Sequence, residues 1–464
     1  MTWTSRLAPA AALGATALCL TACGGSDSSF INTSCDDALR ASCMEISGGD
    51  AEGLLEAVQL IGDDTTIVLG AGTFALDNQV TIRANQVTLV GQGMDETVLD
   101  FGSITTQSNG VDVVGDDFIV VDLEVLDAPK DGIRVEDSDG VVYRRIRTTW
   151  TNAEDPDAGA YGIYPVSSTN VLVEDNEAFN AADAGLYVGQ CQNVIVRNNL
   201  VSGNVAGLEI ENTQYADVYG NTVENNTGGI LVFDLPGNRI VGRDVMIRDN
   251  DVRNNNVPNF APGGVVSEIP AGSGTVVFAS RRVEIRDNTY ENNNTMDISL
   301  VSGLLVESDA ERWEHRTDEL VGDWEDLGLD EGQAEGTVTN FRTENIVVAG
   351  NSHSGGGTSV DTSVELGQLL ALTYLMSAPG VPVDSIVYDG FGESSFDPSD
   401  PGNNSNDNHI CAGENTDGTM VSLDVESQLP VPSGSPVLRL PDPLFAPFDC
   451  TSLEGDPIEV PATL

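Results

Sequence analysis

The sequence predicts an all-β fold, a right-handed parallel β-helix in which every coil adds one strand to each sheet. Two repeated phrases predict it. The first ends in asparagine, at Asn176, Asn199, Asn221, Asn250, Asn288 and Asn351. The second begins with a glycine, at Gly132, Gly162, Gly185, Gly207 and Gly229, with steps of 30, 23, 22 and 22 residues. A period of about 22 residues with short alternating strands matches one solenoid coil and is too short for a propeller blade.

The alternation within each phrase predicts which side chains form the core. Leu186 and Val188 are expected to point inward and Tyr187 outward, toward solvent. The asparagine that closes each phrase is expected to be structural. It tolerates the left-handed conformation of a tight turn, and its amide can bond the equivalent amide of the next coil.

The elements are expected in the following order. Asp50 is a helix N-cap, and the apolar face after it predicts a helix over 50–60 that covers the first coil. Coils begin at 65–74, and the β-helix with its capping helix is expected over 50–355. Insertions are expected at 149–160, 258–275 and 301–343, the last with Trp313, His315 and Trp324. A helix at 365–376 within an irregular cap and wrap, 356–464, is expected to close the far end.

The first 23 residues resemble the leader of a bacterial lipoprotein. Arg6 precedes an apolar run that ends in Leu20-Thr-Ala-Cys23, which is similar to a lipobox. We therefore expect a signal peptide over 1–22, a lipid on Cys23, and a tether and N-terminal segment over 23–49. The membrane would then be reached through the lipid anchor only. Gly24 follows Cys23 where an aspartate would retain the protein in the inner membrane, so the outer membrane is favoured.

The composition limits the partners. The formal net charge is −53, and Lys130 is the single lysine. Nucleic-acid binding is excluded, because it needs cationic groups that displace counterions from phosphates. The same charge counts against an anionic polymer and favours neutral glycans.

The cysteines suggest two disulfides in an oxidising compartment. Cys35 with Cys43 is the local pair before the coils, and Cys411 with Cys450 would clasp the C-terminal segment. Cys191 is left over.

One outward face carries the candidate site. The residues two places after the anchor glycines form one line, namely Arg134, Tyr164, Tyr187, Glu209 and Leu231. Beside it lie Lys130, Tyr161, Asp183, Glu211, Phe233 and Asp234. Tyr161, Tyr164, Tyr187, Phe233 and Asp234 are the expected substrate-binding residues, because aromatic rings and carboxylates suit sugar rings and hydroxyls. An outward tyrosine ladder can equally be ordinary sheet stabilisation.

Three chemistries fit this face. A lyase would use Lys130 and Arg134, with calcium held by Asp183, Glu209 or Glu211. A hydrolase would pair Asp183 with Glu209, or Glu209 with Glu211, at about 5.5 to 9.5 Å. Asp155-Pro-Asp157 is similar to part of the mannuronan epimerase motif, but the histidine of that motif is missing, so we discount this reading.

Longer stretches resemble a known family. Segments such as GAYGIYPV from Gly159, DAGLYVGQ from Asp183 and NTGGILVFDLP from Asn226 look like exported parallel β-helix repeat proteins of marine and related proteobacteria, similar to pectin lyases in fold. The resemblance implies an exported lipoprotein and implies no catalytic residue. Genes of that family often neighbour one for an exported c-type cytochrome-like protein.

The first hypothesis is an exported lipoprotein that binds a polysaccharide along this face and can cleave it. The alternative is a non-enzymatic scaffold or partner of the cytochrome-like redox protein. A purely structural envelope protein is the third hypothesis.

Overall fold

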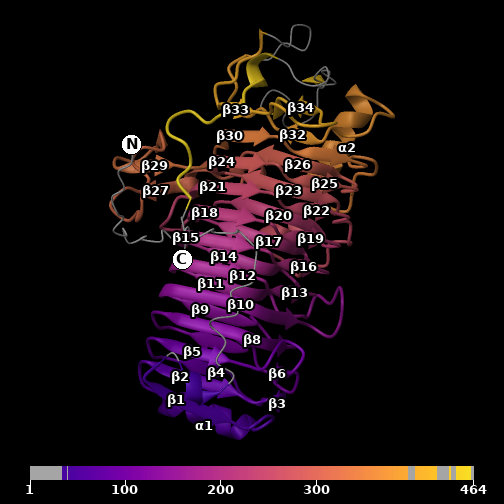
Figure 1. Cartoon of the computed structure of the whole chain (residues 1–464). Coiled ribbons are helices and arrows are strands. Elements are labelled where there is room, and N and C mark those ends of the chain that lie inside the picture. The colour runs from indigo at the N-terminus through magenta and orange to yellow at the C-terminus, as the bar shows by residue number, and fades with distance from the viewer. Residues whose placement is uncertain (1–33, 39, 396–402, 426–437, 440–445, 461–464) are drawn as a thin grey trace, which may run out of the picture. The chain divides into compact units, whose positions relative to one another are not determined.

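The structure, a computed structural model of the chain, describes residues 34–38, 40–395, 403–425, 438–439 and 446–460. The predicted signal peptide and Cys23 lie outside these residues. Parallel strands stack coil upon coil along three faces, two of which belong to one 20-stranded sheet and the third to a 12-stranded sheet, and this confirms the predicted right-handed parallel β-helix (Figure 1). Within the described ranges, no helix is both long and apolar enough to span a membrane.

Sheet A and sheet B form two faces of each coil. Sheet A runs through β1 (Ser42–Ile46), β2 (Thr65–Leu69), β5 (Val87–Val90), β8 (Phe118–Leu126), β10 (Asp139–Thr149), β12 (Thr169–Glu174), β15 (Gln192–Arg197), β18 (Gln214–Tyr219), β21 (Arg243–Arg248), β24 (Arg281–Arg286), β30 (Glu344–Ala349) and β33 (Ile410–Cys411). Sheet B runs through β4 (Val80–Ile82), β7 (Val111–Val113), β9 (Ile133–Glu136), β11 (Tyr161–Val166), β14 (Ala184–Gly189), β17 (Ala206–Glu211), β20 (Gly228–Phe233), β23 (Ser273–Phe278), β26 (Met296–Val301), β32 (Ile386–Tyr388) and β34 (Met420–Ser422), with β35 (Leu438–Arg439) added antiparallel.

A narrower third face closes the coil. It joins β3 (Gly72–Ala75), β6 (Thr97–Asp100), the second halves of β8 and β10, β13 (Glu177–Phe179), β16 (Leu200–Ser202), β19 (Thr222–Glu224), β22 (Asp251–Arg253), β25 (Thr289–Glu291) and β31 (Ser352–Ser354). Inward side chains fill the space between the sheets. Leu186 and Val188 are buried there as predicted, together with Val194 and Val196. The anchor glycines have a steric cause, because a Cβ on Gly162 would lie 2.4 Å from the Gly185 carbonyl oxygen.

The closing asparagines form the predicted amide ladder. Each Nδ2 donates to the Oδ1 of the next, from Asn176 through Asn199, Asn221, Asn250, Asn288 and Asn351 to Asn415, at 2.9 to 3.1 Å. A second ladder joins Asn204, Asn226, Asn255 and Asn293. The expected left-handed conformation, however, lies one residue earlier, at Asp175, Asn198 and Asp249, so the closing asparagines are not the residues with positive φ. Their side chains are buried, and neighbouring amides together with backbone carbonyl oxygens satisfy them.

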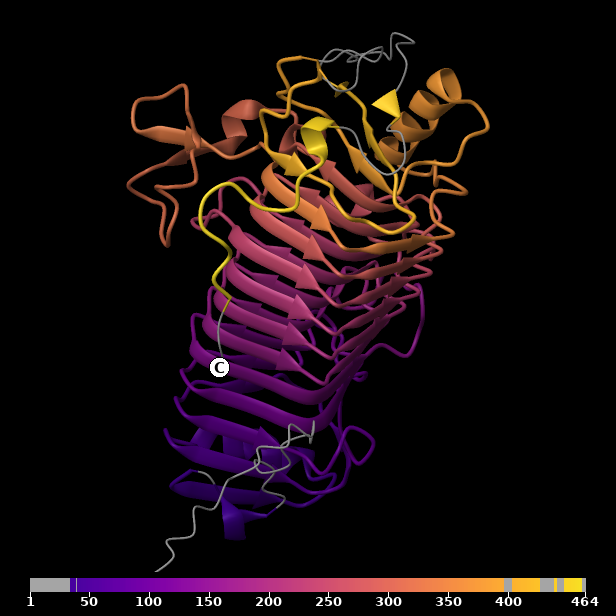
Figure 2. The ribbon, with the colours of Figure 1, turned by 45° about the horizontal axis from the view of Figure 1, so that its top comes forward.

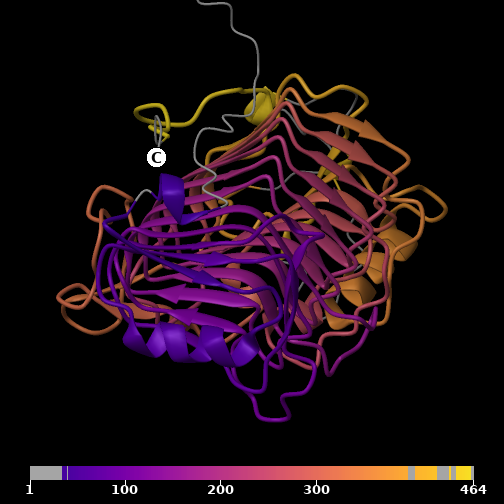
Figure 3. The same ribbon diagram turned by 60° about the horizontal axis from the view of Figure 1, so that its bottom comes forward.

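Helix α1 (Ala51–Leu60) covers the first coil, as predicted (Figure 3). Asp50 caps it, with its carboxylate accepting from Gly53 N at 3.0 Å. Leu54, Ala57 and Val58 form the buried face, which shields the end of the solenoid from pairing with another strand.

The C-terminal part differs from the expected cap. Coils continue past residue 355, because β32 and β34 extend sheet B and β33 extends sheet A. Helix α2 (Glu365–Ser377) packs Leu370 and Tyr374 against Val387 on the outer face of sheet B, so it covers a flank instead of the last coil. Both predicted disulfides, Cys35–Cys43 and Cys411–Cys450, are present, and Cys191 is free and buried.

The insertion at 302–343 carries its own small sheet, the arm, of β27 (Glu314–Arg316), β28 (Asp330–Glu331) and β29 (Thr337–Thr339). Figure 2 shows the arm extending sideways from the coils. Short 3-10 turns precede it at Gly303–Leu305 and Ala310–Trp313, and another, Val265–Glu268, lies in the 258–272 insertion. Two further 3-10 turns lie at Cys35–Asp37 and Ala446–Phe448.

Candidate functional site

Strands β9, β11, β14 and β17 bring the predicted outward line onto one face of sheet B. Tyr164 lies in register with Arg134, and Tyr187 lies in register with Glu209. Strand β11 pairs with β14 so that Tyr161 lies opposite Ala184 and Ile163 opposite Leu186. The same register puts Tyr164 opposite Tyr187. Counting from the anchor glycines therefore gave the correct order of side chains across four coils.

Tyr161, Tyr164 and Tyr187 form one aromatic cluster, the tyrosine cluster. The ring centroids lie 4.8 Å apart for Tyr161 and Tyr164, 4.5 Å for Tyr161 and Tyr187, and 4.9 Å for Tyr164 and Tyr187. Tyr161 and Tyr164 are partly exposed, whereas Tyr187 is 5% exposed. Tyr187 thus points outward as predicted, but neighbouring residues rather than solvent cover it.

Three carboxyl groups adjoin the tyrosine cluster. Burial raises the pKa of Asp183 to about 7, although a hydrogen bond with the Tyr161 hydroxyl lowers it in part. Asp183 is partly exposed, and one of its oxygens, Oδ1, is buried without a hydrogen-bond partner. Asp183 is therefore accessible from outside and has a pKa near neutral pH.

Glu209 and Glu211 lie deeper. Glu209 is 1% exposed, and its pKa lies well above the usual range because of burial first and the charges of Asp183 and Glu211 next. Burial also raises the pKa of Glu211, which accepts hydrogen bonds from the Tyr187 hydroxyl and from Asn238 Nδ2. Among the charges that raise the pKa of Glu209, Asp183 has a stronger influence than Glu211.

An outer apolar cluster closes the outer face of sheet B over β20 and β23. It joins Tyr187 and Leu231 of sheet B to Val266 and Ile269 from the 258–272 insertion and to Trp313 from the 302–343 insertion. Insertions in solenoids often form walls beside a binding face. Here they pack onto the face over β20 and β23, so its partly exposed side chains lie on β9 and β11 and at Asp183, just before β14.

Phe233 and Asp234, predicted to contact substrate, belong to the closed part. The Phe233 ring stacks on Phe278 with centroids 4.7 Å apart, and it is 3% exposed. Asp234 is 1% exposed and accepts hydrogen bonds from Gly242 N at 2.8 Å and Asn340 Nδ2 at 2.6 Å. Burial raises its pKa to about 7. The structure gives both residues a packing role under the insertions.

The predicted cations are already paired. Lys130 Nζ lies 3.3 Å from Asp131 Oδ2, while Arg134 binds Asp112 at 2.9 Å and Glu136 at 2.7 Å. Sequence reasoning missed Asp112 and Asp131. Asp131 is fully buried, and this burial raises its pKa. Asp131 directly precedes Gly132, just as Tyr161 directly precedes Gly162. Counting back one residue from each repeated glycine would therefore have found it.

Among the described residues, His409, Cys411 and Cys450 form a group whose possible ligand atoms all lie within 4.8 Å of one another. Calcium at Asp183, Glu209 or Glu211 stays a prediction. The raised pKa values of Asp183 and Glu209 count against it, since a ligand carboxylate must be ionised.

Comparison with known families identifies the class of this chain. Residues 77–245 and 131–309, which together span half of the sequence, match the family described as "Right handed beta helix region". The chain belongs to this family.

Solved structures share the fold at low similarity. The A-module of the Azotobacter vinelandii mannuronan C-5 epimerase AlgE4 is 14% identical with a TM-score of 0.42, covering 82% of this chain and 94% of that one. The periplasmic alginate epimerase AlgG is 13% identical with a TM-score of 0.39, covering 70% of this chain and 81% of its own. An alginate lyase from Paenibacillus sp. is 14% identical with a TM-score of 0.30, covering 55% of this chain and 91% of that one. These likenesses carry no argument about function. Among curated proteins, nothing matches.

Proposed function

We propose that this chain binds a polysaccharide on the outer face of sheet B over β9 and β11, and that Asp183, which directly precedes β14, donates a proton to the leaving oxygen when the bound polymer is cleaved. The observation that carries the proposal is the tyrosine cluster beside a partly exposed carboxyl group with a pKa of about 7. Tyr161 and Tyr164 offer ring faces for sugar rings, and their hydroxyls lie close to the carboxyl groups that can bond sugar hydroxyls.

The charges at the site favour a neutral glycan. A lyase acting on a uronate needs a free cation to neutralise the substrate carboxylate. Lys130 and Arg134 are already neutralised by Asp131, Asp112 and Glu136. A general acid works best with a pKa near the operating pH, which Asp183 has. Asp183 therefore supports hydrolysis better than elimination, because its proton goes to the leaving oxygen while water adds to the sugar carbon. Glu209, which is buried and has a raised pKa, is not the base for this step.

The direct test is to incubate the soluble chain, residues 24–464, with a panel of neutral and acidic polysaccharides. Products are analysed by mass spectrometry, with and without calcium. Shortened chains with hydrated ends support the proposed hydrolysis, whereas unsaturated ends would show a lyase. If the polymers remain intact, cleavage is rejected and affinity alone decides the binding part of the proposal.

Binding is tested with a matched pair of tyrosine variants. Tyr164→Ala is expected to weaken glycan binding by about 5- to 10-fold, equivalent to the roughly 1 kcal/mol of one aromatic contact. Tyr219→Ala is the control, because Tyr219 is an outward tyrosine on sheet A, packed under Arg248 and away from the site. Equal affinity of both variants and the parent, measured by calorimetry, would reject this face as the binding site.

We further propose that the chain is exported and anchored in the outer membrane by a lipid on Cys23. The support is the lipobox-like Leu20-Thr-Ala-Cys23 and the two disulfides, which persist in oxidising compartments. Cys23→Ser should release the protein from the membrane fraction and abolish incorporation of labelled fatty acid, while Cys19→Ser should leave both unchanged. Membrane association of Cys23→Ser equal to the parent would contradict the anchor. The cytochrome-like partner stays a prediction.

A further inference from the structure

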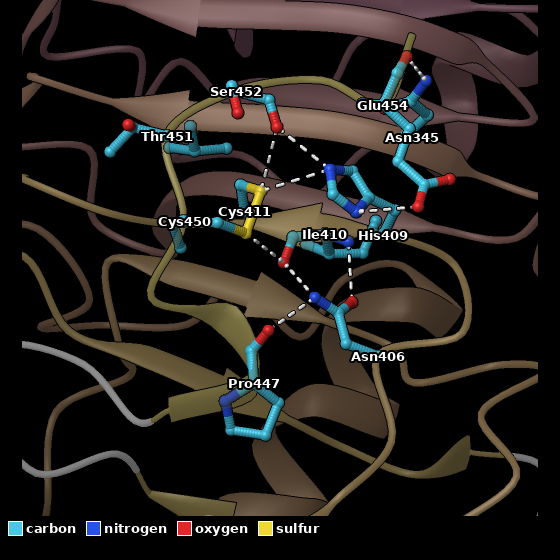
Figure 4. Close-up of a disulfide and its surroundings, with 12 residues drawn as sticks. Asn345, Asn406, His409, Ile410, Cys411, Pro447, Cys450, Thr451, Ser452 and Glu454 are labelled. Carbon is cyan, nitrogen blue, oxygen red and sulfur yellow. Dashed lines mark hydrogen bonds and ion pairs between the residues drawn. A yellow bond between two sulfur atoms is a disulfide. The ribbon is translucent and has the colours of Figure 1, made fainter.

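A histidine lies against the C-terminal disulfide, far along the chain from the tyrosine cluster. Figure 4 shows His409 beside Cys411 on β33, with Cys450 joining from the final segment. His409 Nε2 lies 3.6 Å from Cys411 Sγ. The ligand atoms of His409, Cys411 and Cys450 all lie within 4.8 Å of one another.

This arrangement has the dimensions of a zinc site. Zinc binds thiolate sulfur at about 2.3 Å and imidazole nitrogen at about 2.0 to 2.1 Å, usually with tetrahedral geometry. Those bond lengths and angles place nitrogen and sulfur ligands about 3.5 Å apart. The 3.6 Å between His409 Nε2 and Cys411 Sγ matches this separation. The two sulfurs, now bonded to each other, would have to part to about 3.8 Å.

We propose that reduction of the Cys411–Cys450 disulfide opens a zinc site formed by His409 Nε2, Cys411 Sγ and Cys450 Sγ, with water as the fourth ligand. A dithiol reductant supplies two electrons and two protons, so the disulfide becomes two thiols and the reductant becomes a disulfide. Zinc binding then releases the two thiol protons to solvent. Neutral His409 donates the lone pair of Nε2. This proposal is independent of the proposed glycan binding.

The reductant can reach the bond from one side. Cys411 is fully buried, whereas Cys450 and His409 are partly exposed. A thiolate would therefore attack the Cys450 sulfur and release the Cys411 thiolate next to the imidazole.

The C-terminal segment that carries Cys450, residues 446–460, is held beside β33 by contacts that do not depend on the disulfide. Ala412 N donates to Phe448 O at 2.9 Å, and Gly413 N donates to Cys450 O at 3.0 Å. Arg286 Nη2 donates to Thr451 O at 2.6 Å. These bonds keep the two cysteines close after reduction, so the three ligands stay preassembled.

The neighbours of His409 suit a metal ligand. Nε2 now lies 2.9 Å from Ser452 O, a contact that zinc would replace. Nδ1 lies 3.9 Å from Glu454 Oε1, and the Glu454 side chain is 77% exposed and free to swing closer. A carboxylate that accepts from the second nitrogen of a zinc-bound histidine fixes the tautomer and raises metal affinity.

The test uses the soluble chain with Cys35→Ser and Cys43→Ser, so that Cys411–Cys450 is the remaining disulfide. The protein is reduced with a dithiol, desalted without oxygen, and titrated with zinc against a chromophoric chelator. We expect one equivalent of zinc in the reduced protein and none in the oxidised protein. Cobalt in place of zinc should give the absorption of thiolate-to-metal charge transfer.

Matched variants assign the ligands. His409→Ala should lose the bound equivalent in the titration, while His315→Ala, which changes a histidine of the arm, should bind like the parent. Circular dichroism checks that each reduced protein keeps its β-structure. The proposal is overturned if the reduced protein binds no zinc, whether or not it keeps its β-structure. It is also overturned if the oxidised protein binds as much zinc as the reduced protein, or if His409→Ala binds like the parent.

Discussion

Asp183 is the residue at which the environment changes chemistry most directly. Burial raises its pKa to about 7, so the folded chain holds a proton there that the unfolded chain releases near the usual 3.8. A group with a raised acid pKa stabilises the fold fully below the unfolded value. That contribution is lost as the pH rises from about 4 to about 7.

Asp183→Asn should therefore make stability less dependent on pH. Each pH unit in this window costs the parent at most about 1.4 kcal/mol through this group. We expect the variant to match the parent near pH 4 and to exceed it in unfolding free energy at pH 8, as measured by urea denaturation. Asp157→Asn, a change at an exposed carboxylate in a loop, is the control and should follow the parent. A variant with the parent's pH profile would contradict the buried proton.

At the same scale, the sequence could predict which side chains share the face but not how deeply they lie. Tyr164, Tyr187 and Glu209 align because strand register follows from the repeat. Their exposure depends on residues such as Val266 and Trp313, which belong to insertions without any repeat. The pKa values of Glu209 and Glu211 follow from that cover and were equally beyond a one-dimensional pattern.

At the scale of elements, the two repeated phrases predicted the central strands of sheets A and B, and amphipathic patterns predicted both helices. The strands of the third face, such as β13, β16 and β19, carry neither phrase and were not predicted. Helix α1 begins one residue after its predicted N-cap Asp50, and α2 extends one residue past the predicted end. The coils beyond 355 were missed because β32 and β34 are three residues each and follow no asparagine phrase of the earlier spacing. The placement of α2 was missed because its docking depends on outward-facing apolar residues of sheet B, such as Val387, which the helix buries.

The elements also explain why the site lies where it does. Sheet B keeps partly exposed side chains on β9 and β11, and it is closed over β20 and β23, where two insertions meet. The closed part buries Phe233 and Asp234, and it leaves Asp183 and Tyr161 at the boundary. A boundary of this kind gives carboxyl groups low solvation together with access for a ligand.

On the scale of the whole molecule, the two asparagine ladders run from coil to coil through the solenoid. Each amide bonds the equivalent amide of the adjacent coil. Asn221 donates to Val196 O at 3.1 Å and to Asn250 Oδ1 at 2.9 Å, and it accepts from Asn199 N and Nδ2. All of these groups are buried inside the solenoid. In a solenoid, stability depends on the interfaces between adjacent repeats, so a broken rung weakens the coils on both sides.

Asn221→Ala should lower the unfolding free energy by roughly 3 kcal/mol, because it leaves buried donors and acceptors of two neighbouring coils without partners. Asn152→Ala, which removes an exposed amide in the 149–160 loop, should change it by less than about 0.5 kcal/mol. Urea denaturation gives both values, and hydrogen exchange locates the loss. We expect faster exchange in the coils around β15, β18 and β21 and unchanged protection near α1. A loss no larger than that of the control would show that the ladder amides are replaceable by water and do not hold the coils together.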